Sequence, residues 1–232
     1  MGAEQLVLGV IWYVVLLFSL TLHEAGHAWA AAKGGDPTAY SGGQVSLDPM
    51  PHVRREPFGM VLVPLLSFAL SGFMIGWAST PYDPRWAWAH PRRAGWMSLA
   101  GPAANLVLVV AAAVAIRFGM EAGWFAPGRT NFTELVLATA PGVWETAATF
   151  LSILFTLNLL LLVFNLIPVP PLDGSGAVAL VLSEDGARRL QQLFASPQLS
   201  FVGILIAWWL IPRVFWPVHE LALKLLYPEF LG

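Results

Sequence analysis

Long apolar runs alternate with short polar segments along this chain. The runs occupy about residues 6–22, 58–78, 96–116, 147–167 and 199–216. Each of them approaches the roughly 20 residues that a helix needs to cross the hydrocarbon core of a bilayer. The pattern therefore predicts an all-α polytopic membrane protein with about four to five transmembrane helices.

The run at 58–78 is interrupted by a proline and two glycines, which fit a re-entrant segment as well as a kinked span. The basic residues favour a hairpin-like, re-entrant path, because the loops then obey the positive-inside rule. On that path one membrane face carries most of the basic side chains, namely Lys33, Arg54, Arg55, Arg85, Arg92, Arg93, Arg188 and Arg189. Arg117 and Arg129 lie in the opposite loop. We therefore expect a multi-pass protein of the cell membrane, with the end of the first run toward the cytoplasm.

The polar connections predict smaller elements. Within the Gly- and Pro-rich segment 34–57, residues 41–47 could form a short strand or hairpin, and a plain loop is an equal alternative. Residues 175–195 have the pattern of an amphipathic surface helix. The Trp-rich segment 207–217 is typical of an interfacial belt.

Composition supports a membrane protein and narrows its chemistry. Hydrophobic residues make up 57% of the 232 residues and charged residues 11%, whereas soluble proteins average about 25% charged residues. The net charge of −2 and the lack of a basic tract exclude a nucleic-acid footprint. The absence of cysteine excludes thiolate ligands and disulfides. We expect a single membrane-embedded domain over 1–232, with a core at about 5–175 and C-terminal helices at about 176–232.

A charged motif, His-Glu-Ala-Gly-His at residues 23–27, closes the first apolar run. On a helix its two histidines project from one face and can bind one tetrahedral Zn²⁺, while Glu24 lies beside the metal to move a proton. An ionisable side chain at bilayer depth costs about 2.5–3.5 kcal/mol, so three ionisable side chains so close together are not expected by chance. A chance match, with histidines resting among lipid headgroups, is the alternative.

A second polar motif closes the fourth run, at residues 165–174. Its three prolines end the regular helix, and irregular backbone at this depth survives only when it is buried in protein or lines a hydrated cavity. Asp173 supplies a carboxylate, which suits the third position of a two-histidine zinc site. Asp173 could instead be the N-cap of a helix that starts near Ser175.

In combination these motifs resemble the site-2 protease family of intramembrane zinc metalloproteases. The resemblance rests on residues 23–27, on Gly-Pro-Ala-Ala-Asn at 101–105, and on Asn165 followed by Leu-Asp-Gly at 172–174. The motifs have the order of the family and cover roughly residues 10–180. The chain looks like the compact prokaryotic type, without an inserted PDZ-like domain.

The resemblance implies a set of zinc ligands, namely His23, His27 and Asp173, with one Zn²⁺ per chain. It implies that Glu24 is the general base. The reaction would then be hydrolysis of peptide bonds in membrane-spanning substrates, with a zinc-activated water as the nucleophile.

Two asparagines are also implied at the site, where Asn105 and Asn165 would position the substrate backbone or its developing oxyanion. Each has a structural alternative. Asn105 could tie helices together, and Asn165 could cap carbonyls freed by the nearby prolines. For Asn158 such a structural bond is the favoured interpretation, and for His52 an interfacial loop position is favoured over a place near the metal.

Two other functions are compatible with a zinc site in a membrane. One is a catalytically silent scaffold that sequesters single-span proteins, although all the groups needed for catalysis are present. The other is a zinc transporter, which would need ligands at several depths along a path. For a protease, the expected strand at 41–47 could hold an unwound substrate by edge pairing.

Overall fold

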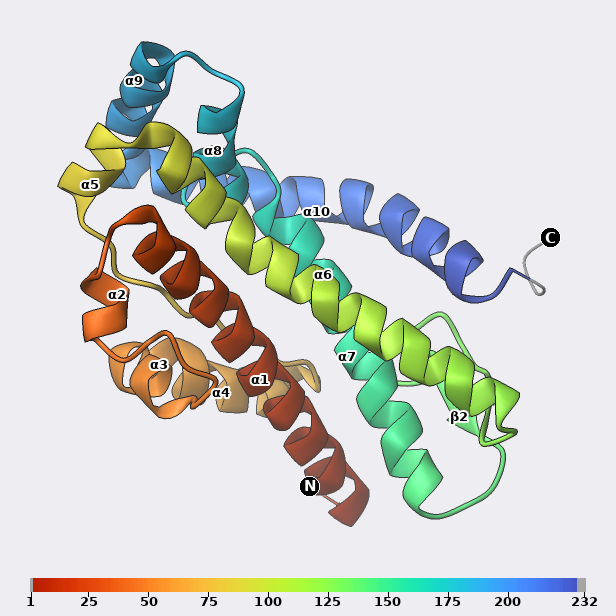
Figure 1. Cartoon of the computed structure of the whole chain (residues 1–232). Helices are drawn as coiled ribbons and strands as arrows, with labels where there is room; N and C mark the ends of the chain where they lie inside the picture. The colour runs from red at the N-terminus through yellow and green to blue at the C-terminus, as the bar shows by residue number, and fades with distance from the viewer. Residues whose placement is uncertain (1, 229–232) are drawn as a thin grey trace.

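The computed structural model describes residues 2–228 and consists mainly of helices (Figure 1). Four helices in that part of the chain are long and apolar enough to cross a membrane: α1 (Ala3–Gly34), α6 (Pro91–Glu121), α7 (Val143–Asn165) and α10 (Pro197–Leu226). The predicted all-α polytopic fold is therefore confirmed. The expected domain also included residues 1 and 229–232, which lie outside the described residues.

Short elements connect the long helices. In chain order they are α2 (Thr38–Ser41), α3 (Met50–Arg55), the π-helix η1 (Phe58–Leu62), α4 (Val63–Ser71), α5 (Pro84–Ala89), β1 (Phe125–Pro127), β2 (Val136–Ala138), α8 (Asp173–Ala177), the 3₁₀-helix η2 (Val178–Leu180) and α9 (Glu184–Phe194). The two strands form one antiparallel pair in the connection between α6 and α7.

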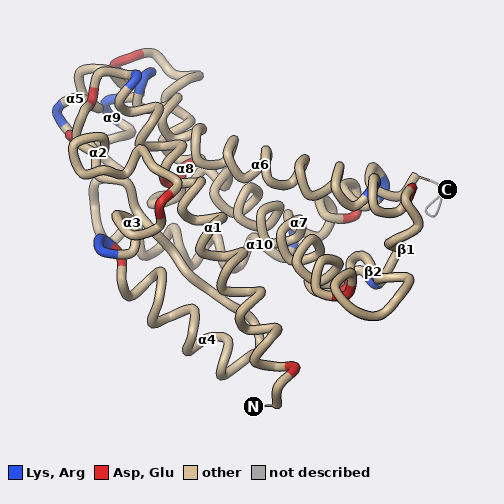
Figure 2. Tube along the Cα trace, turned by 60° about the horizontal axis from the view of Figure 1, so that its bottom comes forward, with Lys and Arg blue, Asp and Glu red and all other residues tan. Residues whose placement is uncertain are grey.

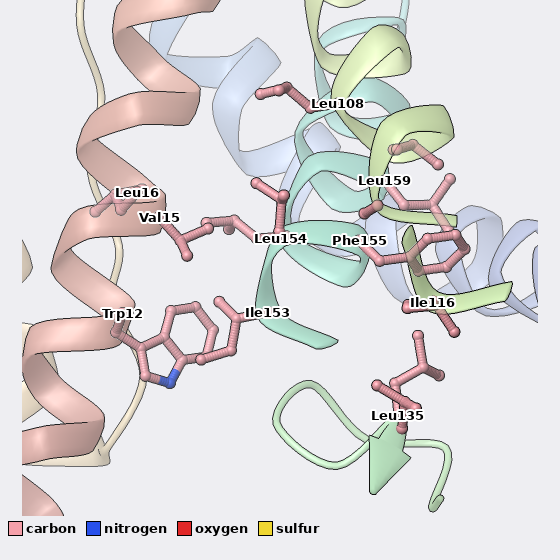
Figure 3. Packing of buried hydrophobic residues seen from close by; sticks show 14 of the residues in the cluster. Trp12, Val15, Leu16, Leu108, Ile116, Leu135, Ile153, Leu154, Phe155 and Leu159 are labelled. Atoms are coloured by element: carbon pink, nitrogen blue, oxygen red, sulfur yellow. The ribbon is translucent and has the colours of Figure 1, made fainter. Parts of the chain in front are cut away.

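Helices α1, α6 and α7 pack together as the centre of the bundle (Figure 1). Apolar side chains of all three fill the space between them, among them Trp12 of α1, Ile116 of α6 and Ile153 of α7 (Figure 3). Toward the other end, a Cβ atom on Gly26 would lie 2.8 Å from the carbonyl oxygen of Ala100. The missing side chain lets α1 and α6 approach closely, as small residues do between membrane helices.

Residues 58–78 turn back within the fold, as the hairpin interpretation predicts. The continuous helix of η1 and α4 ends at Gly72, which adopts a positive φ of 73°. At 1.5 Å per residue its 14 residues cover about 21 Å, short of a hydrocarbon core of about 30 Å. The chain then returns in extended form, and the amide of Trp77 donates to the carbonyl oxygen of Gly59 at 3.1 Å.

Residues 41–47 do not form the strand or hairpin that was one of two equal alternatives. Helix α2 extends to Ser41, and two glycines follow, of which Gly43 has a positive φ of 72°. The amide of Gln44 returns to the carbonyl oxygen of Ala39 at 3.0 Å and closes a turn. The segment is therefore a loop, which was the alternative left open.

Asp36 anchors the connection after α1. Its carboxylate accepts hydrogen bonds from the amide and hydroxyl of Thr38 and from the amide of Asp83. Burial alone would raise the pKa of Asp36, but these hydrogen bonds outweigh burial and hold its pKa below the ordinary value.

The segment 175–195 is not one helix. Helix α8 and η2 end before Ser183, whose hydroxyl accepts the amide of Gly186 and starts α9 as an N-cap. The amphipathic helix is therefore α9 alone. Beyond it, α10 approaches the 165–174 loop so closely that a Cβ on Gly203 would lie 1.8 Å from the carbonyl oxygen of Pro170.

Basic residues gather at one end of the bundle, around α3, α5 and α9 (Figure 2). The C-terminal half of α6 and the two strands lie at the other end, where fewer Lys and Arg positions are coloured. This separation follows the loop charges on which the hairpin interpretation rested.

Candidate metal centre

Two imidazoles meet in the last third of α1, where the helix is buried against α6. His23 and His27 lie four residues apart on one helix face, and they are 5% and 6% exposed. Their Nε2 atoms are 3.0 Å apart. Helical spacing alone therefore brings both nitrogens to one point.

Asp173 reaches the same point from the opposite side. Helix α7 ends at Asn165, and the proline-rich loop that follows turns the chain back toward α1 before α8 begins. One carboxylate oxygen of Asp173 lies 3.1 Å from Nε2 of His23, and the other lies 3.3 Å from Nε2 of His27. Two segments about 150 residues apart in the sequence thus form one cluster of three possible metal ligands.

The other ring nitrogens fix the tautomers of both histidines. Nδ1 of His27 lies 2.7 Å from the carbonyl oxygen of Met97, which can only accept, so this nitrogen carries the hydrogen. Nδ1 of His23 donates to Oδ1 of Asn105 at 2.6 Å. In the neutral rings, both Nε2 atoms therefore face the carboxylate with lone pairs, an arrangement that a cation completes.

The orientation of Asn105 is itself set by a chain of hydrogen bonds. Nδ2 of Asn158 donates to the carbonyl oxygen of Leu154 at 2.8 Å, which leaves its Oδ1 to accept from Nδ2 of Asn105, also at 2.8 Å. Nδ2 of Asn158 also donates to the hydroxyl of Ser19 at 2.9 Å. Asn105, Asn158 and Ser19 are 0% exposed, so this network ties α1, α6 and α7 together behind His23.

The residues present fit a bound Zn²⁺ on three counts. Zinc bonds of about 2.0–2.1 Å in a tetrahedron place neighbouring ligand atoms roughly 3.3 Å apart, close to the separations here. Oδ2 of Asp173 is buried and has no hydrogen-bond partner among the described residues. Gly101 of α6 leaves room beside the nitrogens, since a Cβ there would lie 2.3 Å from Nε2 of His27 and 2.5 Å from Nε2 of His23.

Glu24 lies between the two histidines in sequence and borders the same space. Its side chain is 5% exposed, and its Oε2 accepts a hydrogen bond from the hydroxyl of Thr80 at 2.7 Å. Thr80 belongs to the extended chain that returns from the α4 hairpin. The carboxylate of Glu24 thus borders the same cleft as the three possible metal ligands, and its Oε2 is already bonded to Thr80.

The metal centre opens into a cleft of about 1090 Å³. Walls of the cleft come from α1, the extended segment 75–80, α5, α6, the end of α7, the 165–174 loop, α8, α9 and the first half of α10. Aromatic side chains line it, among them Trp77 of the extended segment, Trp88 of α5 and Trp208 of α10. The cleft is large and apolar enough for a peptide segment with several side chains.

The structure brings three of the six expected site residues, His23, His27 and Asp173, together at one point, and Glu24 lines the same cleft. Asn165 lines the cleft, and its Nδ2 donates to the carbonyl oxygen of Leu161 at 3.0 Å. Asn105 does not line the cleft, because it is fully buried behind His23.

Other residues have a different place from the one expected, or were not singled out. His52 lies in α3 outside the ligand cluster, with its Nε2 at 3.3 Å from the carbonyl oxygen of Ser46. Thr80 was missed because nothing in its sequence surroundings marks it. Ser19 was noticed only as an interruption of an apolar run, and a buried hydroxyl in such a run is the signal that could have indicated a network.

Comparisons with known proteins agree with this geometry. The profile of Peptidase family M50 matches residues 11–210. "Putative zinc metalloprotease YwhC" of Bacillus subtilis is 38% identical over 69% of this chain and 64% of its own length. "Putative zinc metalloprotease Rip2" of Mycolicibacterium smegmatis is 32% identical, and that of Mycobacterium tuberculosis H37Rv is 30% identical, each over 86% of this chain and 70% of its own length.

The chain thus spans about two thirds of the length of these relatives. No solved structure matches it. The family match covers the two histidines, the Gly-Pro-Ala-Ala-Asn segment and the loop that carries Asp173. The chain therefore belongs to Peptidase family M50, the site-2 protease family.

Proposed function

We propose that this protein is a zinc-dependent endopeptidase that hydrolyses peptide bonds of membrane-spanning substrates. One observation carries the proposal: two imidazoles and a carboxylate converge on one point, and Glu24 faces the same cleft. The site lies between helices long and apolar enough to cross a bilayer. Zinc binding, a proton acceptor and access for a peptide are thereby combined at one membrane depth.

The chain's own residues divide the chemical work. When bound, zinc lowers the pKa of a water ligand toward about 7 and polarises the scissile carbonyl. Glu24 takes the proton of that water as general base and returns it to the leaving amine as general acid. His23, His27 and Asp173 hold the metal, and the Nδ1 partners of the histidines keep both rings in place.

The extended segment 75–80 is the part of the chain best placed to hold an unwound substrate. It lines the cleft next to Glu24, whereas the loop at 41–47 does not. Within a bilayer, unpaired backbone groups need partners, and an extended substrate can supply them by edge pairing. A substrate helix must unwind to reach this segment, because an intact helix shields its carbonyls.

The asparagines then take different roles. One hydrogen of the Asn165 amide is used on Leu161, and the second hydrogen is left for a substrate carbonyl or its oxyanion. Asn105 acts through His23 and does not touch the substrate. The clustering of basic residues at the α5 and α9 end supports a cytoplasmic-facing active site in the cell membrane (Figure 2).

The test compares zinc content with cleavage in purified protein. A panel of membrane-spanning peptides with a fluorophore and a quencher is reconstituted with wild type, with Glu24→Gln and with the matched control Glu4→Gln in the exposed first turn of α1. We expect Glu24→Gln to keep its zinc and to lose about 100- to 10,000-fold of the cleavage rate. The control should cleave normally.

Other outcomes would select other functions. Zinc binding with tight capture but no cleavage of any peptide supports the silent scaffold. Zinc uptake into proteoliposomes supports a transporter. Normal cleavage by Glu24→Gln rejects the proposed role of Glu24.

A further inference from the structure

We propose that Thr80 is a positioning residue whose hydroxyl holds the carboxylate of Glu24 and assigns different tasks to its two oxygens. The inference rests on the proposed function, because it concerns the residue proposed as general base. Thr80 follows a re-entrant hairpin and stands 56 residues from Glu24 in the sequence.

The contact between the two residues is short and well placed. The hydroxyl of Thr80 lies 2.7 Å from Oε2 of Glu24 and 2.9 Å from the main-chain oxygen of the same residue. Among the described residues, no side chain or amide donates to the other oxygen, Oε1. Oε2 is thus occupied by Thr80, and Oε1 is the oxygen left to exchange a proton.

The two acceptors let one hydroxyl serve both states of Glu24. A threonine hydroxyl carries a single hydrogen and can donate it to one acceptor at a time. While Glu24 is ionised, the charge-assisted bond to Oε2 is the stronger one. When Oε1 has taken the proton of the attacking water, the hydroxyl can turn to the main-chain oxygen of Glu24 without losing a partner. The proton then passes from Oε1 to the leaving amine, and the hydroxyl returns to Oε2.

The neighbouring residue gives a matched comparison. Successive side chains of an extended chain point to opposite sides, and the hydroxyl of Ser79 has partners other than Glu24. It donates to Oε1 of Glu56 at 2.5 Å and accepts from Nε of Arg55 at 3.2 Å. Ser79 therefore anchors the segment to α3 and its C-cap through Arg55 and Glu56, whereas Thr80 anchors it to Glu24.

The test uses the zinc-loaded full chain and the peptide that wild type cleaves fastest. Loss of a hydrogen bond to a charged group predicts that Thr80→Val lowers kcat by about 10- to 100-fold. KM and zinc content should change little. Thr80→Ser keeps a hydroxyl and should stay within about threefold of wild type. Ser79→Ala should affect KM more than kcat.

A spectroscopic measurement tests the contact without any substrate. The infrared carboxylate band of Glu24 is identified as the difference between wild type and Glu24→Gln. We expect Thr80→Val to shift this band, and Thr80→Ser and Ser79→Ala to leave it in place. This comparison tests the contact between Thr80 and Glu24 even if the protein cleaves no peptide of the panel.

Each contrary result overturns the inference. An unshifted band in Thr80→Val would show that the hydroxyl does not hold Glu24. A kcat in Thr80→Val equal to wild type, with Glu24→Gln inactive, would reject Thr80 and leave the proposed function standing. Equal losses in Thr80→Ser, Thr80→Val and Ser79→Ala would assign the segment a purely structural anchor.

Discussion

Adding a single methyl group at Gly101 should empty the metal centre while the bundle stays folded. A Cβ at this position would lie 2.3 Å and 2.5 Å from the Nε2 atoms of His27 and His23. Ordinary contacts need about 3.5–4.0 Å, so the methyl overlaps both nitrogens by more than about 1 Å. It fills the space beside the nitrogens, on the side from which α6 faces α1.

The magnitude follows from what the rings can do in response. Each ring is held by an Nδ1 hydrogen bond, of 2.6 Å for His23 and 2.7 Å for His27, and can retreat only by lengthening it. Overpacking of this kind costs about 1–3 kcal/mol of stability. A zinc site tolerates changes of only about 0.2 Å in its bond lengths. We therefore expect Gly101→Ala to lose more than about 100-fold in zinc affinity, beyond the usual effect of an outer-shell change.

The assay is competition for zinc with a chelating dye, together with thermal unfolding in the same detergent. Gly95→Ala is the matched control, since it makes the same change on α6 but meets the side chain of Leu180 at 2.9 Å and the carbonyl oxygen of Gly176 at 3.4 Å, and neither histidine. Both variants should unfold at slightly lower temperatures, and only Gly101→Ala should lose zinc. Wild-type zinc affinity in Gly101→Ala would refute the reasoning, because the metal would then not lie where the three ligand atoms converge.

Three further substitutions test the surroundings of the site. Asn105→Leu removes the acceptor for His23 and should lower zinc affinity by about 10- to 100-fold in the same competition assay; unchanged affinity would contradict that role. Asp36→Asn should lower the unfolding temperature near pH 7, because folding stabilises the ionised form of Asp36. The difference in unfolding temperature from wild type should shrink as the pH falls through the lowered pKa of Asp36, and a difference that does not depend on pH would contradict this. Gly203→Ala should push α10 away from Pro170 and cost about 1–3 kcal/mol in unfolding experiments, whereas unchanged stability would show that the helix can shift freely.

Local chemistry made the cluster of three possible metal ligands predictable from sequence. The spacing of His23 and His27 needs only one helix, and that helix was marked by its apolar run. Asp173 became a candidate ligand only in combination with the two-histidine motif and the family resemblance, because taken alone it could equally be a helix N-cap. The hairpin at 58–78 followed from loop charges, which act on topology without any knowledge of packing.

What the sequence could not supply depends on contacts between distant segments. The hydroxyl of Thr80 matters only because the hairpin returns it to Glu24, and no local pattern encodes that path. For Asn105 the sequence left open whether it borders the substrate or ties helices together, and only the fold shows its Oδ1 bonded to Nδ1 of His23 and its Nδ2 to Asn158. A strand at 41–47 was one of two alternatives, and a turn at the two glycines makes this segment a loop instead.

The most direct measurement is an anomalous difference map, recorded at the zinc absorption edge from crystals of the zinc-loaded protein. The account predicts one strong peak at about 2.0–2.2 Å from Nε2 of His23, Nε2 of His27 and a carboxylate oxygen of Asp173. A map with no peak at that point, or with its peak elsewhere in the chain, would contradict it.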